Sequence, residues 1–267
     1  MILRLVFLGL VLLPFTLVAL PIQAFIVFFR LPGWQVVPLM FFKILAFGLG
    51  LRVSMQGEPV ADGPVLLVAN HIGWLDIVAV ASRVPVSFVA KSEIARWPVV
   101  GLFAKLHRTI FVERTRRTDS RRTANEMSTR IAEGASVVLF AEGTSDIGTH
   151  VLPFRSALMG AASTAMGTNG GSQVVIQPLA IAYTAISGLP LSRHERHQVA
   201  WIGDMGVGDN LAAILGSGPK DVRLAFGAPL PANGDRKVTA RTAEASVRRM
   251  LNALNRREPL PSAANMV

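Results

Sequence analysis

Short apolar runs alternate with helical patterns after Arg52, and this alternation limits the possible folds more than any other feature. Buried strands are expected at the apolar runs, which are 65–68, 86–90, 109–112, 136–140, 174–183 and 221–226. Helices are expected at 93–106 with a break at Trp97-Pro98, and at 119–133, 156–166 and 239–255. Strands that alternate with helices predict an α/β fold, with a mostly parallel or mixed sheet flanked by helices.

The N-terminal region is almost entirely apolar. Residues 5–29 contain no charged side chain and are long enough to cross a bilayer core, for which about 20 residues suffice. A cleaved signal peptide is the rival interpretation, but its apolar region would be shorter, and no small-x-small site followed by polar sequence is visible. A second apolar stretch, 36–51, is interrupted by Lys43 and is expected to be a helix lying against the membrane or the domain.

The apolar N-terminal region and the alternating pattern after Arg52 divide the chain into three parts. We expect membrane-anchoring hydrophobic helices at 1–51, an α/β domain at 52–257 and a loose C-terminal tail at 258–267. The composition favours membrane attachment, because 51% of the residues are hydrophobic, the mean hydropathy is +0.44 and the formal net charge is +10. A chain this apolar and basic favours an anionic membrane surface, and not nucleic acid, as its partner.

The stretch Ala-Asn-His-Ile-Gly-Trp-Leu-Asp, residues 69–76, lies where the first buried strand meets a helical run. α/β folds place their chemistry at such junctions. On an unbroken helix His71 and Asp76 would point about 140° apart, so the two can meet only if the chain bends, which Gly73 permits. A carboxylate on one imidazole nitrogen leaves the other nitrogen as a base. The plainer alternative is that Asn70 and Asp76 only cap the helix.

The absence of cysteine narrows the chemistry, because no thiolate can act as the nucleophile. We therefore expect His71 to activate a hydroxyl that belongs to the substrate. A metal site is not expected. His194 and His197 lie in a polar loop, and no second cluster of ligands supports zinc.

Polar side chains also end the later strands. Arg108 and Arg114 bracket the strand at 109–112, and a guanidinium there can bind an anionic head group. The alternative is an exposed strand end. The segment Glu142-Gly143-Thr144-Ser145 follows the strand at 136–140, where it can orient a hydroxyl group or form an ordinary turn. Pro178 interrupts the last long apolar run, which predicts an edge strand or a bulge near a pocket.

Taken in order, four blocks of sequence resemble the glycerolipid acyltransferase family, which bacterial lysophosphatidate acyltransferases typify. The blocks are Asn-His-x4-Asp, a Lys-Ser-Glu segment leading to Arg-Thr-Ile-Phe-Val-Glu-Arg, Phe-Ala-Glu-Gly-Thr, and a Gln-Pro strand. The resemblance covers about residues 50–230. It implies a membrane-bound O-acyltransferase that moves a fatty acyl group from an acyl carrier protein or coenzyme A thioester to a lysolipid hydroxyl, without cofactor or metal.

The same resemblance assigns roles to individual residues. His71 would be the general base and Asp76 its orienting partner. Arg114 and the block from Glu142 to Thr144 would bind the acceptor, and Gln177-Pro178 would line the acyl site. The family further implies a bacterial inner-membrane enzyme with its catalytic domain on the cytoplasmic face.

One departure from the family pattern concerns the acceptor. Phosphate-binding members usually read Phe-Pro-Glu-Gly-Thr-Arg in the third block, where this chain has Ala141 and Ser145. Losing a guanidinium weakens recognition of a phosphate dianion. The sequence looks closest to the branch that acylates lyso-ornithine lipid, whose zwitterionic head group could meet Arg155 or Arg114. The alternatives are a 1-acylglycerol-3-phosphate acyltransferase, a metal-free hydrolase and a non-catalytic membrane lipid-binding protein.

Overall fold

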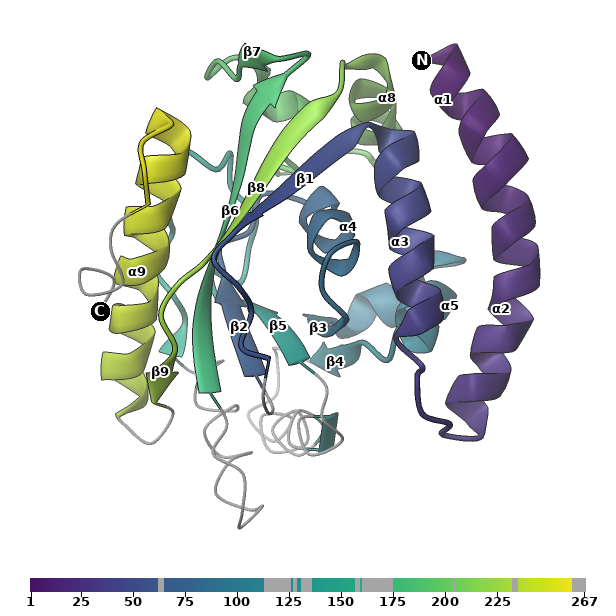
Figure 1. Cartoon of the computed structure of the whole chain (residues 1–267), viewed down its shortest axis with the longest axis horizontal. Helices are drawn as coiled ribbons and strands as arrows, with labels where there is room; N and C mark the ends of the chain where they lie inside the picture. Colours follow the sequence, from purple (N-terminus) through teal and green to yellow (C-terminus); the bar gives the residue numbers. More distant parts are fainter. Residues whose placement is uncertain are drawn as a thin grey trace.

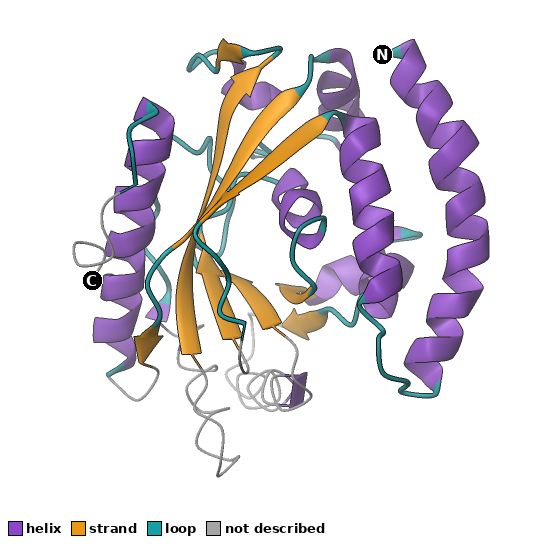
Figure 2. Ribbon diagram, viewed as in Figure 1, coloured by secondary structure: helices purple, strands orange, loops and turns teal. Residues whose placement is uncertain are grey.

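The computed structural model describes residues 1–61, 65–112, 126, 129–130, 136–156, 159, 175–203, 205–231 and 235–260. These residues form a mixed β-sheet with helices on both faces and a long apolar helix at the N-terminus (Figures 1 and 2). The α/β fold predicted from the sequence is confirmed. The predicted helices at 119–133 and 156–166 lie almost wholly outside the described residues.

The described part of the sheet has the strand order β1-β8-β6-β2-β5-β3-β4, with the short β7 and β9 also paired to β6. The strands are β1 (Leu51–Gln56), β2 (Val65–Ala69), β3 (Val86–Lys91), β4 (Ile110–Val112), β5 (Ser136–Phe140), β6 (Val175–Ile186), β7 (Leu189–Pro190), β8 (Lys220–Phe226) and β9 (Leu230–Pro231). Strands β2 to β6 run parallel, whereas β8 is antiparallel to β6. The carboxyl ends of β2 to β6 therefore share one edge, where the segments after β2 and β5 meet.

Three helical segments form one continuous rod at the N-terminus. They are α1 (Ile2–Phe7), a π-helical turn (Leu8–Leu12) and α2 (Leu13–Phe28). The rod is long and apolar enough to cross a membrane by length and composition, and few of its residues are buried. Helix α3 (Val36–Leu49) lies beside it, confirming the second predicted helix, and ends at Gly50 in a left-handed conformation (Figure 1).

Two layers of apolar side chains bury the two faces of the sheet. On one face α3 and α4 (Leu75–Ala81) pack against the strands, and on the other face α9 (Arg236–Arg256) lies along β6 (Figure 2). Asp235 begins α9, where its side chain accepts a hydrogen bond from the Lys237 amide. The remaining helical pieces are η2 (Ser92–Arg96), α5 (Val100–Leu106), η3 (Glu195–Gln198) and α8 (Val207–Gly216).

Arg4 connects the N-terminal rod to the domain at a helix end that Lys220 of β8 also contacts. Arg4 donates to the Ser217 carbonyl at 2.6 Å, and Lys220 donates to the Ile214 carbonyl at the same distance. Both carbonyls lie at the C-terminal end of α8, where unpaired carbonyl groups favour cations. Burial lowers the pKa of Lys220 to about 8. Arg4 thus binds α1 to the same helix end that Lys220 caps.

The predicted edge position of Pro178 is wrong, because β6 is paired on both sides. The Gly227 amide donates to the Pro178 carbonyl, so the proline nitrogen faces the same neighbour. That neighbour is interrupted there, because β8 ends at Phe226 and β9 begins at Leu230. The proline lacks an N–H group, but no strand hydrogen bond is lost, because no neighbouring strand residue lies opposite it in this gap. Strand β1 and helix α8 were not predicted from the sequence.

Candidate active site

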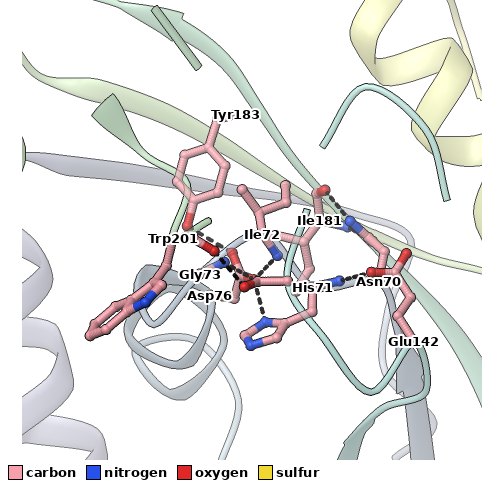
Figure 3. A network of polar contacts seen from close by, with 10 residues as sticks. Asn70, His71, Ile72, Gly73, Asp76, Glu142, Ile181, Tyr183 and Trp201 are labelled. Atoms are coloured by element: carbon pink, nitrogen blue, oxygen red, sulfur yellow. Dashed lines mark hydrogen bonds and ion pairs between the residues drawn. The ribbon is translucent and has the colours of Figure 1, made fainter. Parts of the chain in front are cut away.

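His71 and Asp76 meet at the carboxyl end of β2 (Figure 3). His71 Nδ1 lies 2.9 Å from Asp76 Oδ2. The Asp76 side chain is fully buried, whereas the His71 side chain is 23% exposed. Because the carboxylate accepts from Nδ1–H, the lone pair of this imidazole lies on Nε2. This geometry fixes the imidazole and leaves Nε2 as the ring nitrogen that Asp76 does not contact.

Both carboxylate oxygens of Asp76 accept hydrogen bonds. Oδ2 also accepts from the amides of Ile72 and Gly73, at 2.6 and 3.0 Å. Oδ1 accepts from the hydroxyl of Tyr183 at 2.9 Å (Figure 3). Burial, with the Asp76 charge, raises the pKa of Tyr183 well above its ordinary value, so this phenol remains a donor. Four donors therefore fix the carboxylate that orients His71.

Tyr183 was not predicted to belong to the site, because nothing in the sequence of an apolar strand indicates that a tyrosine hydroxyl within it is functional. The only available signal was that this is the single tyrosine of the chain. Asn70 was considered only as a helix cap, and its role is different. Its side chain both donates to and accepts from the backbone of Ile181, at 3.0 and 2.9 Å, which fastens the end of β2 to β6.

Gly73 is needed for space, not for an unusual backbone angle. Its φ is not in the left-handed region, and a Cβ added there would lie 3.1 Å from Trp201 N and 3.3 Å from Val199 O. The Trp201 amide donates to the Ile72 carbonyl at 2.9 Å. The bend between His71 and Asp76 is therefore held by close backbone packing of the segment before α8.

Glu142 supports the His71 segment from the end of β5. One carboxylate oxygen accepts from the His71 amide and the other from the Leu152 amide, both at 3.0 Å. The side chain is buried. Burial raises the pKa of Glu142 to about 8, against the opposing effect of the two amide donors. In this structure Glu142 contacts the backbone that carries the base.

The raised pKa of Glu142 predicts a pH-dependent stability. Between its ordinary value of 4.5 and about 8, the folded chain binds the Glu142 proton more tightly than the unfolded chain. The contribution of Glu142 is therefore greatest below pH 4.5, decreases as the pH rises to about 8, and is constant above. We expect the difference in thermal midpoint between the wild type and Glu142→Gln to change across this window. Parallel pH curves for the two proteins would contradict the assignment.

The rest of the third block forms a tight turn beside His71. Gly143 has φ +72°, and the side chain of Arg155 passes so close that a Cβ there would lie 2.8 Å from Arg155 Nε. Thr144 is exposed, and Ser145 donates its hydroxyl hydrogen bond to the Trp201 carbonyl. Gly143, Thr144 and Ser145 all line the cavity that His71 faces.

This cavity has a volume of about 940 Å³ and lies between the N-terminal helices and the domain. Its wall is mainly apolar and combines residues of α2, α3 and α5 with the His71 and Gly143 segments. Four stacked rings mark its length, with successive centroid separations of 4.1, 6.1 and 5.4 Å. They are His71, Phe140, Phe88 and His107. The volume and the mainly apolar wall suit an aliphatic ligand that reaches His71.

His107 and Gln23 place polar groups in this apolar wall. Burial lowers the pKa of His107 to about 4, so the ring is neutral at physiological pH. Gln23 donates to the Trp34 and Leu106 carbonyls, at 3.0 and 2.9 Å, and so fastens α2 to the end of α5. His107 is therefore not suited to act as a base, because it is buried and lies three rings away from the His71–Asp76 pair.

Other predicted site residues are not brought to the cavity. The guanidinium of Arg108 lies over the Trp34 ring, 5.1 Å from its centroid. Pro178 is not among the residues that line the cavity, and neighbouring Gln177 bonds to the backbone of Glu58 and Gly227. Arg114 lies outside the described residues. Within the described part of the chain, no group of three or more metal-ligating side chains is found.

Comparisons with known proteins show the family to which the chain belongs. A sequence model of the acyltransferase family matches residues 52–182. The lyso-ornithine lipid O-acyltransferase of Brucella abortus is 43% identical over 234 residues, which cover 86% of this chain and 88% of that protein. The chain belongs to the acyltransferase family. It is an enzyme that transfers acyl groups.

Other relatives of this acyltransferase show how far the similarity extends. The lyso-ornithine lipid O-acyltransferase of Rhizobium meliloti is 36% identical over 91% of this chain and 84% of its own. The 1-acyl-sn-glycerol-3-phosphate acyltransferase of Neisseria gonorrhoeae is 37% identical, over 43% of this chain and 45% of its own. A crystal structure of the 1-acyl-sn-glycerophosphate acyltransferase of Thermotoga maritima shares the fold. Its TM-score is 0.61, at 20% identity over 94% of this acyltransferase and 97% of that chain.

Proposed function

We propose that this acyltransferase moves a fatty acyl group from an acyl carrier protein or coenzyme A thioester to the hydroxyl of lyso-ornithine lipid, giving ornithine lipid at a membrane. The observation that supports this proposal most is the hydrogen-bonded His71–Asp76 pair at the wall of a mainly apolar cavity of about 940 Å³. The extended similarity to lyso-ornithine lipid O-acyltransferases supports the choice of acceptor.

The reaction needs one group that acts first as a general base and then, after it has taken up the proton, as a general acid. His71 Nε2 takes the proton of the acceptor hydroxyl as its oxygen attacks the thioester carbon. The buried Asp76 carboxylate stabilises the imidazolium that forms. When the tetrahedral intermediate collapses, the C–S bond breaks and the new ester remains. His71 then returns its proton to the leaving thiolate, so protons balance and the enzyme is regenerated.

The oxyanion of the intermediate needs hydrogen-bond donors that are not already used. The amides of His71, Ile72 and Gly73 are engaged with the Glu142 and Asp76 carboxylates. The turn at 143–145 lines the same cavity beside His71. Within this turn the Gly143 amide already donates to the Phe140 carbonyl at 3.2 Å. We therefore assign the oxyanion donors to the backbone N–H groups of Thr144 and Ser145.

The acceptor head group would meet this turn from outside. Arg155 is exposed where it passes over Gly143, and a guanidinium there can pair with the carboxylate of ornithine. Ser145 replaces the arginine of phosphate-binding members and is tied to Trp201 by its hydroxyl. Among the described residues, the turn carries the Arg155 guanidinium and no arginine at position 145, which matches one carboxylate better than a phosphate dianion.

Replacing Ser145 by Arg tests this assignment. The substitution restores a charge-assisted donor at the head group, so the rate on lysophosphatidate relative to lyso-ornithine lipid should rise about tenfold. Initial rates with each lysolipid in the same vesicles measure the ratio. Ser54→Arg is the matched control, since Ser54 is exposed on β1 at the far edge of the sheet. An unchanged ratio in Ser145→Arg would remove this residue from acceptor selection.

Acylation of lysophosphatidate is the second candidate function. The Neisseria gonorrhoeae relative with that activity in its name matches nearly half of this chain. In this candidate the Arg155 guanidinium beside Gly143 would supply positive charge in place of the missing arginine of the third block.

The direct experiment uses the full chain in vesicles with an isotope-labelled acyl carrier protein thioester and lyso-ornithine lipid. Mass spectrometry of the extracted lipid should show the label in an ester of the lysolipid hydroxyl. Label recovered only as free fatty acid would show hydrolysis, and label confined to the thioester would show a non-catalytic protein. Either result would overturn the proposal.

A further inference from the structure

Four apolar side chains are exposed where η2 meets α5. They are Trp97, Val99, Val100 and Leu102, with exposed fractions of 42%, 67%, 47% and 47%. We call this group the α5 tip. Single exposed apolar residues are common, but a contiguous cluster on a short turn marks an interaction surface.

The backbone of the α5 tip is strained at its most exposed residue. Val99 has φ +63° and ψ −63°, and the Val100 amide donates to the Pro98 carbonyl at 2.6 Å. This is the γ-turn that is rare in proteins, and a β-branched residue at its centre is a strained outlier. A glycine would adopt the turn without this strain. Because the Val99 side chain is 67% exposed, its burial among the described residues does not offset this strain, which favours a contact with a partner outside the chain.

The α5 tip continues the apolar surface of the N-terminal rod. Trp97, Val99 and Val100 line the same cavity as Ala19 and Leu20 of α2. The hydrogen bond from Gln23 to the Leu106 carbonyl holds α2 against α5 at its other end. Figure 1 shows α5 beside the lower part of α2 and α3. The outer face of the rod is itself exposed and apolar along its length.

Charge around the α5 tip favours an anionic surface. Lys91, Arg96 and Lys105 are exposed within the segment that carries the tip, and Glu93 is its one acidic residue. Exposed basic residues beside exposed apolar and Trp side chains are the pattern of interfacial membrane segments.

We propose that the α5 tip inserts into an anionic bilayer beside α2 and opens the cavity to the hydrocarbon region. A lipid-borne chain can then pass from the bilayer to His71 without crossing water. The identity of that chain rests on the proposed function, whereas the insertion itself does not.

Spin labelling tests the insertion without any enzyme assay. The chain has no cysteine, so Val100→Cys gives one labelling site. Val238→Cys is the matched control, because Val238 is also an exposed valine in the first turn of a helix, on α9 across the sheet. In full-length protein bound to vesicles of phosphatidylcholine and phosphatidylglycerol, the label at 100 should be accessible to oxygen and shielded from a polar nickel complex. The label at 238 should show the reverse. Aqueous accessibility at both positions would overturn the proposal.

A kinetic comparison tests whether insertion of the α5 tip helps a lysolipid to pass from the bilayer to the cavity. Val100→Asp should raise KM about tenfold for a lysolipid presented in vesicles, and the increase should be much smaller in detergent micelles. Val238→Asp should leave both values unchanged. If the acidic acyl carrier protein docks at the α5 tip instead, Val100→Asp will raise KM for the thioester and not for the lysolipid, which would contradict membrane insertion. Because labelling needs no turnover, failure of the proposed acceptor leaves the insertion result interpretable.

Discussion

His71→Ala should reduce acyl transfer by at least about 10³-fold while the protein remains folded and membrane-bound. The structure offers no substitute base among the described residues that line the cavity near Asp76. His107 lies three rings away, and burial holds its pKa at about 4. Single-turnover transfer from a labelled thioester measures the loss directly, because it isolates the chemical step from product release.

The control for His71→Ala is His197→Ala. His197 is exposed in η3, away from the cavity, so its loss should leave the rate unchanged. Circular dichroism and sedimentation with membranes show whether each variant is folded and bound. Near wild-type turnover in folded His71→Ala would eliminate His71 as the base.

Asp76→Asn should be nearly as severe, with a loss of about 10³–10⁴-fold, as expected when an orienting carboxylate is neutralised. The amide is almost isosteric, so its oxygen can still accept from the Ile72 and Gly73 amides, and Tyr183 can rotate its hydroxyl to accept from the new NH₂ group. The bend should therefore survive. What is lost is the buried charge that stabilises the His71 imidazolium.

Thermal stability separates this explanation from simple misfolding. We expect Asp76→Asn to retain a cooperative unfolding transition while it loses acyl transfer. Wild-type kcat/KM in this variant would show that the hydrogen bond at 2.9 Å is structural only.

Periodicity was sufficient to predict most strands, because buried parallel strands are continuous apolar runs. The predicted strand 136–140 is β5 without change, and the predicted break at Trp97-Pro98 separates η2 from α5. Strand β1 was missed although apolar and polar residues alternate along it, which is the pattern of a half-buried strand; Leu51 is its one buried residue. The edge position of Pro178 was wrong because the gap between β8 and β9 is a tertiary feature.

The active site was predictable where chemistry follows from residue type. His71 and Asp76 stood out through their spacing and their place after a buried strand. Tyr183 did not, because its contact with Asp76 joins positions 107 residues apart. Glu142 was placed in the acceptor site by family resemblance, whereas its carboxylate contacts the His71 and Leu152 amides. Such contacts depend on the order of strands in the sheet, which no local pattern encodes.

One competition assay tests the central claim most directly. Lyso-ornithine lipid and lysophosphatidate are mixed in equal amounts in the same vesicles, the full-length protein and an acyl carrier protein thioester are added, and the two products are quantified at early times. Our account predicts that ornithine lipid forms in clear excess and that both products disappear in His71→Ala. Phosphatidate as the main product would contradict the proposed acceptor while leaving the His71 chemistry intact.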